Sequence, residues 1–399
     1  MTNSADYWQN KILEITADYN SELPIGKEIQ TAFLETPRHL FIRRYKVSQK
    51  DTEWQEVNEA NLAEHLPRLY QNHSLVLWKE NNDKRVSTIS QPSLVLYMLN
   101  LLKLKPGHKV LELGAGSGWN AALMGHIVGS SGHIYSLEII PEIANRAAEN
   151  IDRFGMDNVS IIEADAGDGY ETESPFDRII FTASAFDLPR NLYHQIKEDG
   201  LLLIVIKIEG GTDNLFLLQK KDEHFESIDS SPCKFVDVTG KYSLGYDPIE
   251  LEDLPEWTEL QTKEISRTLF WWGHKELDFI WRTMPIRFWL SISEPLFQTF
   301  CSSTNSNQKS FFGIWDKENQ SLAIVKDDRI ITYGTSHARE RLLADIYSWV
   351  DLGMPSPTCF KLQIYPIDVP VPVTGDRWIV KRQESQFVWQ LDNNHQEPI

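Results

Sequence analysis

The stretch KVLELGAGSGW, residues 109–119, decides the fold that the sequence predicts. Its first part is apolar and rich in strand-forming residues, which predicts a short buried strand that ends at Gly114. Glycines follow at alternate positions, Gly114, Gly116 and Gly118, and a helix is expected to begin at Trp119. Because glycine has no Cβ and tolerates positive φ, this arrangement lets backbone N–H groups approach a bound cofactor closely.

The glycine spacing indicates which cofactor to expect. A dinucleotide fingerprint, G-x-G-x-x-G, would need its third glycine where Trp119 stands, and tryptophan would block close helix–strand packing. The spacing G-x-G-x-G is instead typical of methyltransferases that use S-adenosyl-L-methionine (SAM). A second strand, residues 133–137, ends at Glu138, where an acid accepts hydrogen bonds from ribose hydroxyls. An ordinary glycine turn with a surface glutamate is the alternative.

Strands and helices are expected to alternate through the next hundred residues. This alternation predicts an α/β fold: a doubly wound, mostly parallel, Rossmann-like sheet, with an N-terminal helical segment before it and an α+β domain after it. We expect strands at 159–165, 176–181, 201–208, 214–220 and around Phe235, helices at 141–154 and 189–197, and a turn at Asp199-Gly200.

Ligands of such sheets lie beyond the carboxyl ends of the strands. Asp165 ends the third strand and is followed by small residues, which suits a hydrogen bond to the adenine amino group. Small residues also follow the fourth strand, at 182–185. The residues predicted to bind the cofactor are Gly114, Ala115, Gly116, Gly118, Glu138, Ile139, Asp165, Ala166 and Ala183.

A polar turn, Ser87-Thr-Ile-Ser-Gln-Pro92, precedes a strongly apolar helix expected at 93–104. Pro92 fits the first turn of that helix, and Ser90 could serve only as its cap. Alternatively, the turn lies over the cofactor's methyl group and holds the substrate. In that case Ser90 and Thr88 are the candidate catalytic residues, and Ser87, Gln91 and Ser184 are candidate substrate contacts.

The composition of the chain limits the kinds of binding partner and cellular environment to expect. The chain has 399 residues, which predicts at least two compact units, and a net charge of −18, which disfavours nucleic acid and acidic membrane surfaces as partners. No secretory signal or membrane-spanning run is visible, and the three cysteines are far apart. We therefore expect a reduced, cytoplasmic protein without a disulfide framework or a metal site.

The order of motifs resembles the protein-L-isoaspartate (D-aspartate) O-methyltransferase family. The TISQP turn just upstream of the glycine loop is the specific part of the resemblance, which covers roughly residues 25 to 240. The motifs that carry it are Thr36-Pro-Arg-His-Leu-Phe41, Thr88-Ile-Ser-Gln-Pro92, Val110-Leu-Glu-Leu-Gly-Ala-Gly-Ser-Gly118, Asp165 and Lys234-Phe-Val-Asp-Val-Thr239.

The resemblance implies a SAM-dependent enzyme that methylates an aspartyl or isoaspartyl carboxylate in a peptide or protein. It implies that Ser90 is the active-site hydroxyl, Gly114 and Gly116 the cofactor loop, Glu138 the ribose acid and Asp165 the adenine site. Such an ester can close to a succinimide (aspartimide). The carboxylate is already ionised at neutral pH, so positioning rather than a strong base would carry the catalysis.

The chain continues for about 160 residues beyond the usual end of the family. Longer forms are similar to methyltransferases that tailor ribosomally made peptides (RiPPs), which makes peptide tailoring our first functional hypothesis. General isoaspartyl repair is the second, and a non-catalytic peptide-binding protein is the third. The expected division is 1–85 as an N-terminal, substrate-side segment, 86–240 as the methyltransferase core, and 241–399 as a peptide-recognition domain.

Tryptophans are concentrated in the C-terminal part. Core packing is the ordinary role of such residues, and a peptide groove is the alternative. They are Trp257, Trp271, Trp272, Trp281, Trp289, Trp315, Trp349, Trp378 and Trp389.

Overall fold

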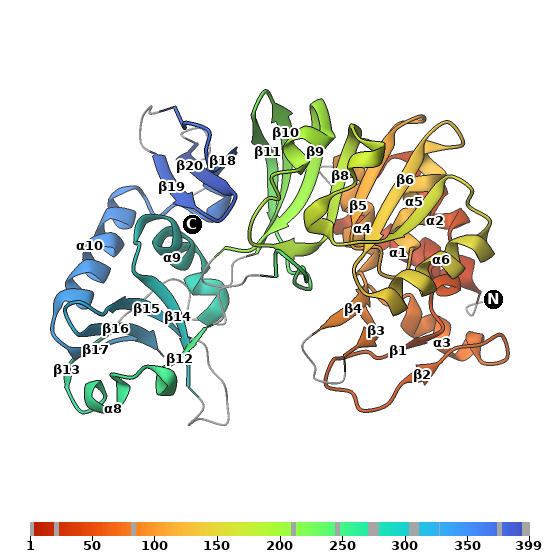
Figure 1. Cartoon of the computed structure of the whole chain (residues 1–399). Coiled ribbons are helices and arrows are strands. Elements are labelled where there is room, and N and C mark those ends of the chain that lie inside the picture. The colour runs from red at the N-terminus through yellow and green to blue at the C-terminus, as the bar shows by residue number, and fades with distance from the viewer. Residues whose placement is uncertain are drawn as a thin grey trace. The chain divides into compact units, whose positions relative to one another are not determined.

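The computed structural model describes residues 4–19, 24–80, 85–208, 213–243, 248–269, 279–302, 311–326, 328–372 and 377–392. The chain forms two compact units, each described separately below (Figure 1). The N-terminal unit comprises Met1–Val205, Leu215–Asp229 and Cys233–Ser243, and the C-terminal unit comprises Ile206–Asn214, Ser230–Pro232 and Leu244–Ile399. The main division thus follows Ser243, close to the boundary expected at residue 240.

The N-terminal unit is built on a sheet with the strand order β11-β10-β9-β8-β5-β6-β7 (Figure 1). β5 runs parallel to both β6 and β8, and β6 runs parallel to β7. The predicted α/β sheet is therefore confirmed. The strands are β5 (Lys109–Leu113), β6 (His133–Glu138), β7 (Val159–Glu163), β8 (Phe176–Ala185), β9 (Ile196–Ile206), β10 (Asn214–Lys221) and β11 (His224–Pro232).

Three helices flank the parallel strands: α4 (Pro92–Leu102), α5 (Trp119–Val128) and α6 (Pro141–Phe154). Nearly all of α5 is buried, and it contacts β6 and β7. α6 is amphipathic, begins with proline and ends at Gly155, whose left-handed conformation suits a helix C-terminus. The bounds of α6 and the start of α5 are those that the sequence predicts, whereas α4 begins one residue and ends two residues earlier than expected.

Strand register brings the predicted site residues to one edge of the sheet. Leu113, the last residue of β5, lies opposite Leu137 of β6 and Phe181 of β8. The residues that follow these positions, including Gly114 and Glu138, therefore meet at the carboxyl ends of the central strands.

The segment before the sheet is mostly helical, as the sequence predicts, and short antiparallel pairs, β1–β2 and β3–β4, interrupt its helices. α1 packs against α4. The segment predicted as a polar turn, Ser87–Pro92, is a strand in its first part, because β4 extends to Ile89, and only Ser90 and Gln91 connect this strand to α4. The elements are α1 (Ala5–Tyr19), α2 (Lys27–Glu35), η1 (Arg38–Phe41), β1 (Arg44–Tyr45), β2 (Gln55–Glu56), α3 (Leu62–Leu69), β3 (Leu75–Lys79) and β4 (Val86–Ile89).

Two predicted elements were wrong. The helix expected at 189–197 is a single turn, α7 (Leu192–Gln195), because β9 already begins at Ile196 and continues through Asp199, which adopts a positive φ of 58°. The segment around Phe235 is not a strand of the sheet. It makes only an isolated parallel bridge, Ser184 with Asp237, and β11 is the strand that follows β10.

The C-terminal unit has its own core. Its six-stranded sheet has the order β12-β14-β15-β16-β17-β13, and α10 packs on β15 and β16. β18, β20 and β19 form antiparallel pairs. The elements are β12 (Ile249–Glu250), α8 (Trp257–Leu260), β13 (Glu264–Leu269), α9 (Phe279–Ser293), β14 (Phe297–Cys301), β15 (Phe311–Asp316), β16 (Ser321–Lys326), β17 (Arg329–Gly334), α10 (His337–Asp351), β18 (Phe360–Pro366), β19 (Arg377–Lys381) and β20 (Ser385–Leu391).

The described tryptophans of this unit mostly pack inside it. Trp289, Trp349 and Trp389 are buried, and Trp349 donates its indole N–H to the carbonyl of Pro355. For these three, core packing is the role that the structure shows. Trp271, Trp272 and the side chain of Trp281 lie outside the described residues.

Candidate active site

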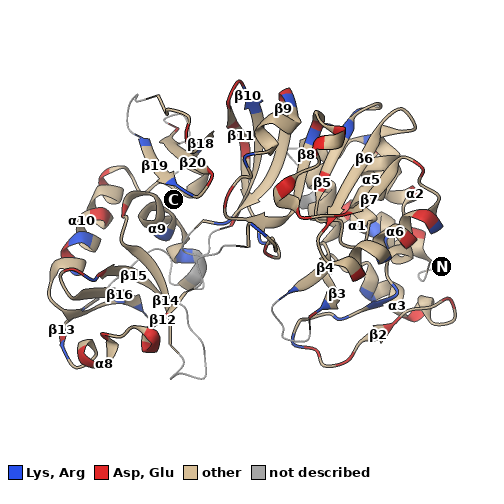
Figure 2. Cartoon of the chain, viewed as in Figure 1, with Lys and Arg blue, Asp and Glu red and all other residues tan. Residues whose placement is uncertain are grey.

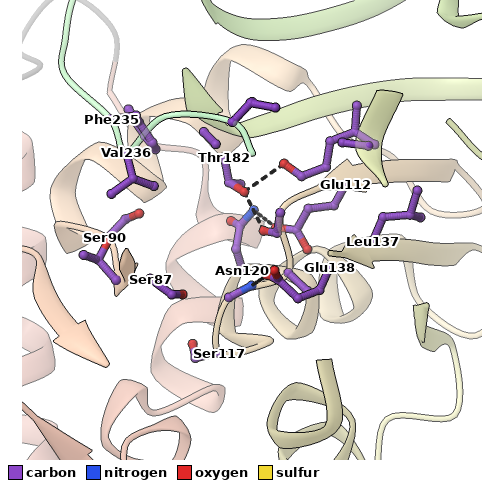
Figure 3. Close-up of a pocket in the computed structure, with 18 of the residues that line it drawn as sticks. Ser87, Ser90, Glu112, Ser117, Asn120, Leu137, Glu138, Thr182, Phe235 and Val236 are labelled. Carbon is purple, nitrogen blue, oxygen red and sulfur yellow. Dashed lines mark hydrogen bonds between the residues drawn. The ribbon is translucent and has the colours of Figure 1, made fainter. Parts of the chain in front are cut away.

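A pocket lies at the carboxyl ends of the central strands of the N-terminal unit (Figure 3). Ser87, Ser90 and Val236 stand on one side of it in this view, and Glu112 and Glu138 stand on the other. The predicted site residues that line the pocket are Ser87, Thr88, Ser90, Gly114, Ala115, Gly116, Glu138, Ile139, Ala166 and Ala183. The polar turn and the glycine loop, 24 residues apart between Ser90 and Gly114, therefore share one cavity.

Ser90 does not cap the following helix. The N-cap of α4 is Gln91, whose own side chain makes no capping hydrogen bond. The N–H of Ser93 is instead bound by the side-chain oxygen of Asn72, at 3.0 Å. This removes the purely structural role that the sequence left open for the Ser90 hydroxyl.

Glu138 is buried at the pocket wall and holds the glycine loop. Its carboxylate accepts from the N–H of Gly116 at 3.0 Å and from the N–H of Ile140 at 3.1 Å. Burial raises the pKa of this carboxyl group, while the backbone N–H groups partly oppose the shift.

Glu112 is a pocket residue that the sequence analysis did not single out. It is fully buried on β5, and its carboxylate accepts from Asn120 at 2.6 Å and from Ser136 at 2.5 Å. Burial raises its pKa to about 7. The signal was present in the sequence, since Glu112 is the one charged residue inside an otherwise apolar run, Val110–Leu113.

The segment 235–239 forms a further wall of the pocket, although it lies far from the glycine loop in sequence. Two backbone hydrogen bonds fix it to the end of β8: Ser184 N–H to Val236 O at 2.7 Å, and Val238 N–H to Ser184 O at 2.9 Å. Ser184 therefore anchors this wall through its backbone, and it does not itself line the pocket.

Three further predicted residues also lie outside the pocket lining. Gly118 precedes α5 with a φ of 81°, and Gln91 donates its side-chain amide to the hydroxyl of Ser93 at 3.0 Å. Asp165 accepts from the N–H of Gly167 at 2.8 Å and from that of Lys241 at 2.9 Å. These two bonds direct the Asp165 carboxylate toward the local turn and the chain after Gly240.

The pocket is acidic. The ionisable side chains that line it, among the described residues, are Glu112, Glu138 and Asp237. A carboxylate-lined cavity favours a cationic guest, and the open backbone of the glycine loop permits close approach. A cofactor that carries a sulfonium and an ammonium group fits these residues.

The matching family model is that of protein-L-isoaspartate(D-aspartate) O-methyltransferase, and it matches residues 15–243. This is more than half of the chain. The chain belongs to this family. It is therefore a SAM-dependent carboxyl methyltransferase, which confirms the predicted class of enzyme and the predicted cofactor.

Curated relatives agree with this assignment. Protein-L-isoaspartate O-methyltransferase 2 of Archaeoglobus fulgidus is 35% identical over 232 residues, which cover 57% of this chain and 93% of the relative. The enzyme of that family from Hyperthermus butylicus is 42% identical over 39% of this chain and 68% of its own. A solved structure titled protein-L-isoaspartate O-methyltransferase has a TM-score of 0.53 at 23% identity, covers 89% of this chain and 96% of its own, and so shows the shared fold.

The structure also shows how charged residues are distributed and whether metal-binding clusters or membrane-spanning helices are present among the described residues. Acidic and basic residues are interspersed over the elements of both units (Figure 2). Among the described residues we find no cluster of side chains suited to a metal ion, and no helix that is long and apolar enough to span a membrane.

Proposed function

We propose that this methyltransferase acts on isoaspartyl carboxylates in age-damaged proteins and peptides. The observation that carries the proposal is the shared pocket: the hydroxyl-bearing turn Thr88–Ser90 and the glycine loop line the same cavity. The names of the relatives, which describe protein-L-isoaspartate as the substrate, support repair over peptide tailoring. The acceptor would be a peptide or protein, and the net charge of −18 disfavours nucleic acid.

The cofactor would lie against the glycine loop and the acidic wall. Gly114, Ala115 and Gly116 offer a backbone that a ligand can approach closely. Glu138, the last residue of β6, and Ile139, which follows it, line the neighbouring wall. Ala166 and Ala183 complete the lining with small side chains. The proposed roles of Gly118 and Asp165 are indirect, since their contacts shape α5 and the turn at 165–168.

Bound SAM supplies an electrophilic methyl group. The substrate's carboxylate oxygen attacks that carbon in line, so an O–C bond forms as the S–C bond breaks and the opposite charges of the two partners are neutralised. Because the nucleophile is already ionised, the task of the protein is to orient and partly desolvate it. The hydroxyls of Ser90 and Thr88 suit that task, since they donate hydrogen bonds without bringing a charge; Ser87, also on this wall, would contact the peptide.

The methyl ester makes the carbonyl electrophilic, so the next backbone nitrogen can attack it. Methanol then leaves and a succinimide forms. This second step requires no residue of the enzyme. Hydrolysis of the succinimide returns part of the chain to normal aspartate, which is the repair outcome.

Peptide tailoring stays as the alternative because of the C-terminal unit, whose separate core could bind one chosen substrate. The structural match that covers 89% of this chain weakens that argument, since it extends past residue 243 in a protein titled as an isoaspartate methyltransferase. A C-terminal extension is therefore compatible with the repair fold.

A substrate panel separates the two proposals. The full chain is incubated with methyl-labelled SAM and several unrelated peptides, each prepared with isoaspartate or with ordinary aspartate at the same position. We expect methanol release from every isoaspartyl peptide and from none of the aspartyl controls. Turnover of aspartyl peptides, or of one isoaspartyl sequence only, would favour tailoring instead.

A further inference from the structure

Arg38 is a large charged residue that is fully buried beside the active-site turn. Its side chain is fully buried in η1, and the guanidinium donates to four backbone carbonyls: Leu69, His73 at 3.1 Å, Ile89 at 3.2 Å and Ser90 at 2.9 Å. The guanidinium also stacks over the ring of Trp119, the first residue of α5, at 5.7 Å. Arg38 thus contacts the polar turn and the helix that follows the glycine loop.

The Arg38 charge has no acidic partner among the described side chains. Its bonds go to neutral carbonyls, and its Nε has no hydrogen-bond partner. Burying a cation without a carboxylate is costly, so packing is a poor reason to place arginine here. Burial lowers its pKa to about 9, so the side chain remains protonated at neutral pH.

The Ile89–Ser90 peptide connects the buried Arg38 charge with the pocket. Ile89 and Ser90 both line the pocket, whereas Arg38 does not. The carbonyl and the N–H of a trans peptide point in opposite directions. With the Ile89 carbonyl bound by Arg38, the N–H of Ser90 in the same peptide is directed away from Arg38. Because Ile89 and Ser90 line the pocket and Arg38 does not, we infer that this N–H faces the pocket.

The substrate carboxylate needs a strong hydrogen-bond donor on the pocket wall. The ionisable side chains of the pocket wall are acidic among the described residues, which suits the cationic cofactor but repels a carboxylate. A peptide N–H whose carbonyl is bound by a cation is polarised and becomes a stronger donor to an anion.

We propose that Arg38 is a positioning residue that selects the anionic acceptor through the Ile89–Ser90 peptide. The Ser90 N–H and the Ser90 hydroxyl together bind the substrate carboxylate, and Arg38 polarises and holds that peptide from behind. This inference rests on the proposed carboxylate substrate. It adds an anion-selecting device that contains no charged side chain in the pocket itself, so the cationic cofactor meets no repulsion there.

The test compares two peptides and two variants of the full chain, with the protein saturated with S-adenosylhomocysteine for the binding measurements and supplied with SAM for the turnover measurements. One peptide carries isoaspartate, and the other is identical except that the free carboxylate is a carboxamide. Arg38→Lys keeps the charge with fewer donors, and Arg38→Gln keeps a donor without the charge. Binding is measured by calorimetry, and kcat and KM are measured with the isoaspartyl peptide.

We expect the unaltered protein to prefer the carboxylate peptide by at least about tenfold. Arg38→Gln should reduce this preference to nearly one and raise the peptide KM more than it lowers kcat, whereas Arg38→Lys should retain the preference within about threefold. Affinity for S-adenosylhomocysteine should stay the same in both variants.

A merely structural arginine gives a different result. Both variants would then bind the two peptides more weakly in equal proportion, and an unchanged preference in Arg38→Gln would overturn the proposal. If that variant does not fold, loss of the preference in Arg38→Lys would overturn it as well. Methylation of isoaspartyl peptides by the unaltered protein tests the proposed function separately, so the two failures can be told apart.

Discussion

At the scale of single residues, Ser90 lies where a nucleophile would need to be oriented. Its turn lines the pocket, and its hydroxyl is not used as a helix cap. We expect Ser90→Ala to lower kcat for an isoaspartyl peptide by roughly 10–100-fold, since a hydrogen bond to a charged group is lost. SAM affinity, measured by calorimetry, should change little. Unchanged turnover would remove Ser90 from the catalytic residues.

Glu112 gives a pH dependence of stability. Its pKa is raised to about 7 in the folded protein from an ordinary value of 4.5, so the folded state holds the proton more tightly. The stabilisation that this provides is present below about pH 4.5 and is lost as the pH rises through about 7, at up to about 1.4 kcal/mol per pH unit.

Glu112→Gln should remove this contribution to the pH dependence of the free energy of unfolding. The free energy of unfolding of the variant, relative to the unaltered protein, should therefore rise between pH 5 and pH 8 in urea titrations. Glu163→Gln, which removes an equal charge from an exposed position at the end of β7, is the control. A difference for Glu112→Gln that does not vary with pH would contradict this account.

At the scale of elements, the glycine loop depends on the strand beside it. Gly114 has a φ of 112°, and a Cβ at this position would lie 2.4 Å from the hydroxyl oxygen of Thr182 on β8. That hydroxyl donates to the carbonyls of Leu113 and Gly114, at 3.1 and 2.5 Å. The bonds tie the end of β5 to β8 at the point where the pocket opens.

We expect Gly114→Ala to lower the free energy of unfolding by about 2 kcal/mol or more and to weaken SAM binding, because the backbone strain and the clash add together. Gly155→Ala is the matched control: φ is also positive, at 78°, but nothing lies within 4 Å of the added Cβ. It should cost about 1 kcal/mol and leave SAM affinity unchanged. Equal effects of the two substitutions would show that the contact with Thr182 is unimportant.

At the scale of the whole molecule, each of the two units has a hydrophobic core of its own. Separate cores predict that unfolding is not a single two-state transition. The pocket proposed to hold SAM draws its lining from the N-terminal unit, so a bound cofactor should stabilise that unit selectively.

We therefore expect two calorimetric transitions in the full chain. S-adenosylhomocysteine should raise the midpoint of one, and Phe300→Ala, which empties a fully buried site in the C-terminal core, should lower the other by removing about 3–5 kcal/mol. A single transition that responds to both changes would show that the units unfold as one.

The sequence predicted the local order of the catalytic unit well. The strands β5, β6, β7 and β8 and the helices α4, α5 and α6 were found with small shifts at their ends. Their periodicity and their glycine and proline boundaries are short-range signals. The helix expected at 189–197 is reduced to one turn because β9 begins at Ile196, and the turn expected at Asp199-Gly200 lies inside that strand.

What the sequence by itself determined is therefore the α/β order, the glycine loop and the edge of the sheet at which the pocket lies. The tertiary structure decided which distant groups complete that edge: Arg38 behind Ser90, 52 residues away, and residues 235–239 bound to the end of β8. Tertiary packing also decides that the Asp165 carboxylate accepts from the N–H of Lys241 and that the Glu112 side chain is buried. The physical reason is that periodicity encodes which face of an element is buried, whereas the partner of a polar group depends on packing between distant segments.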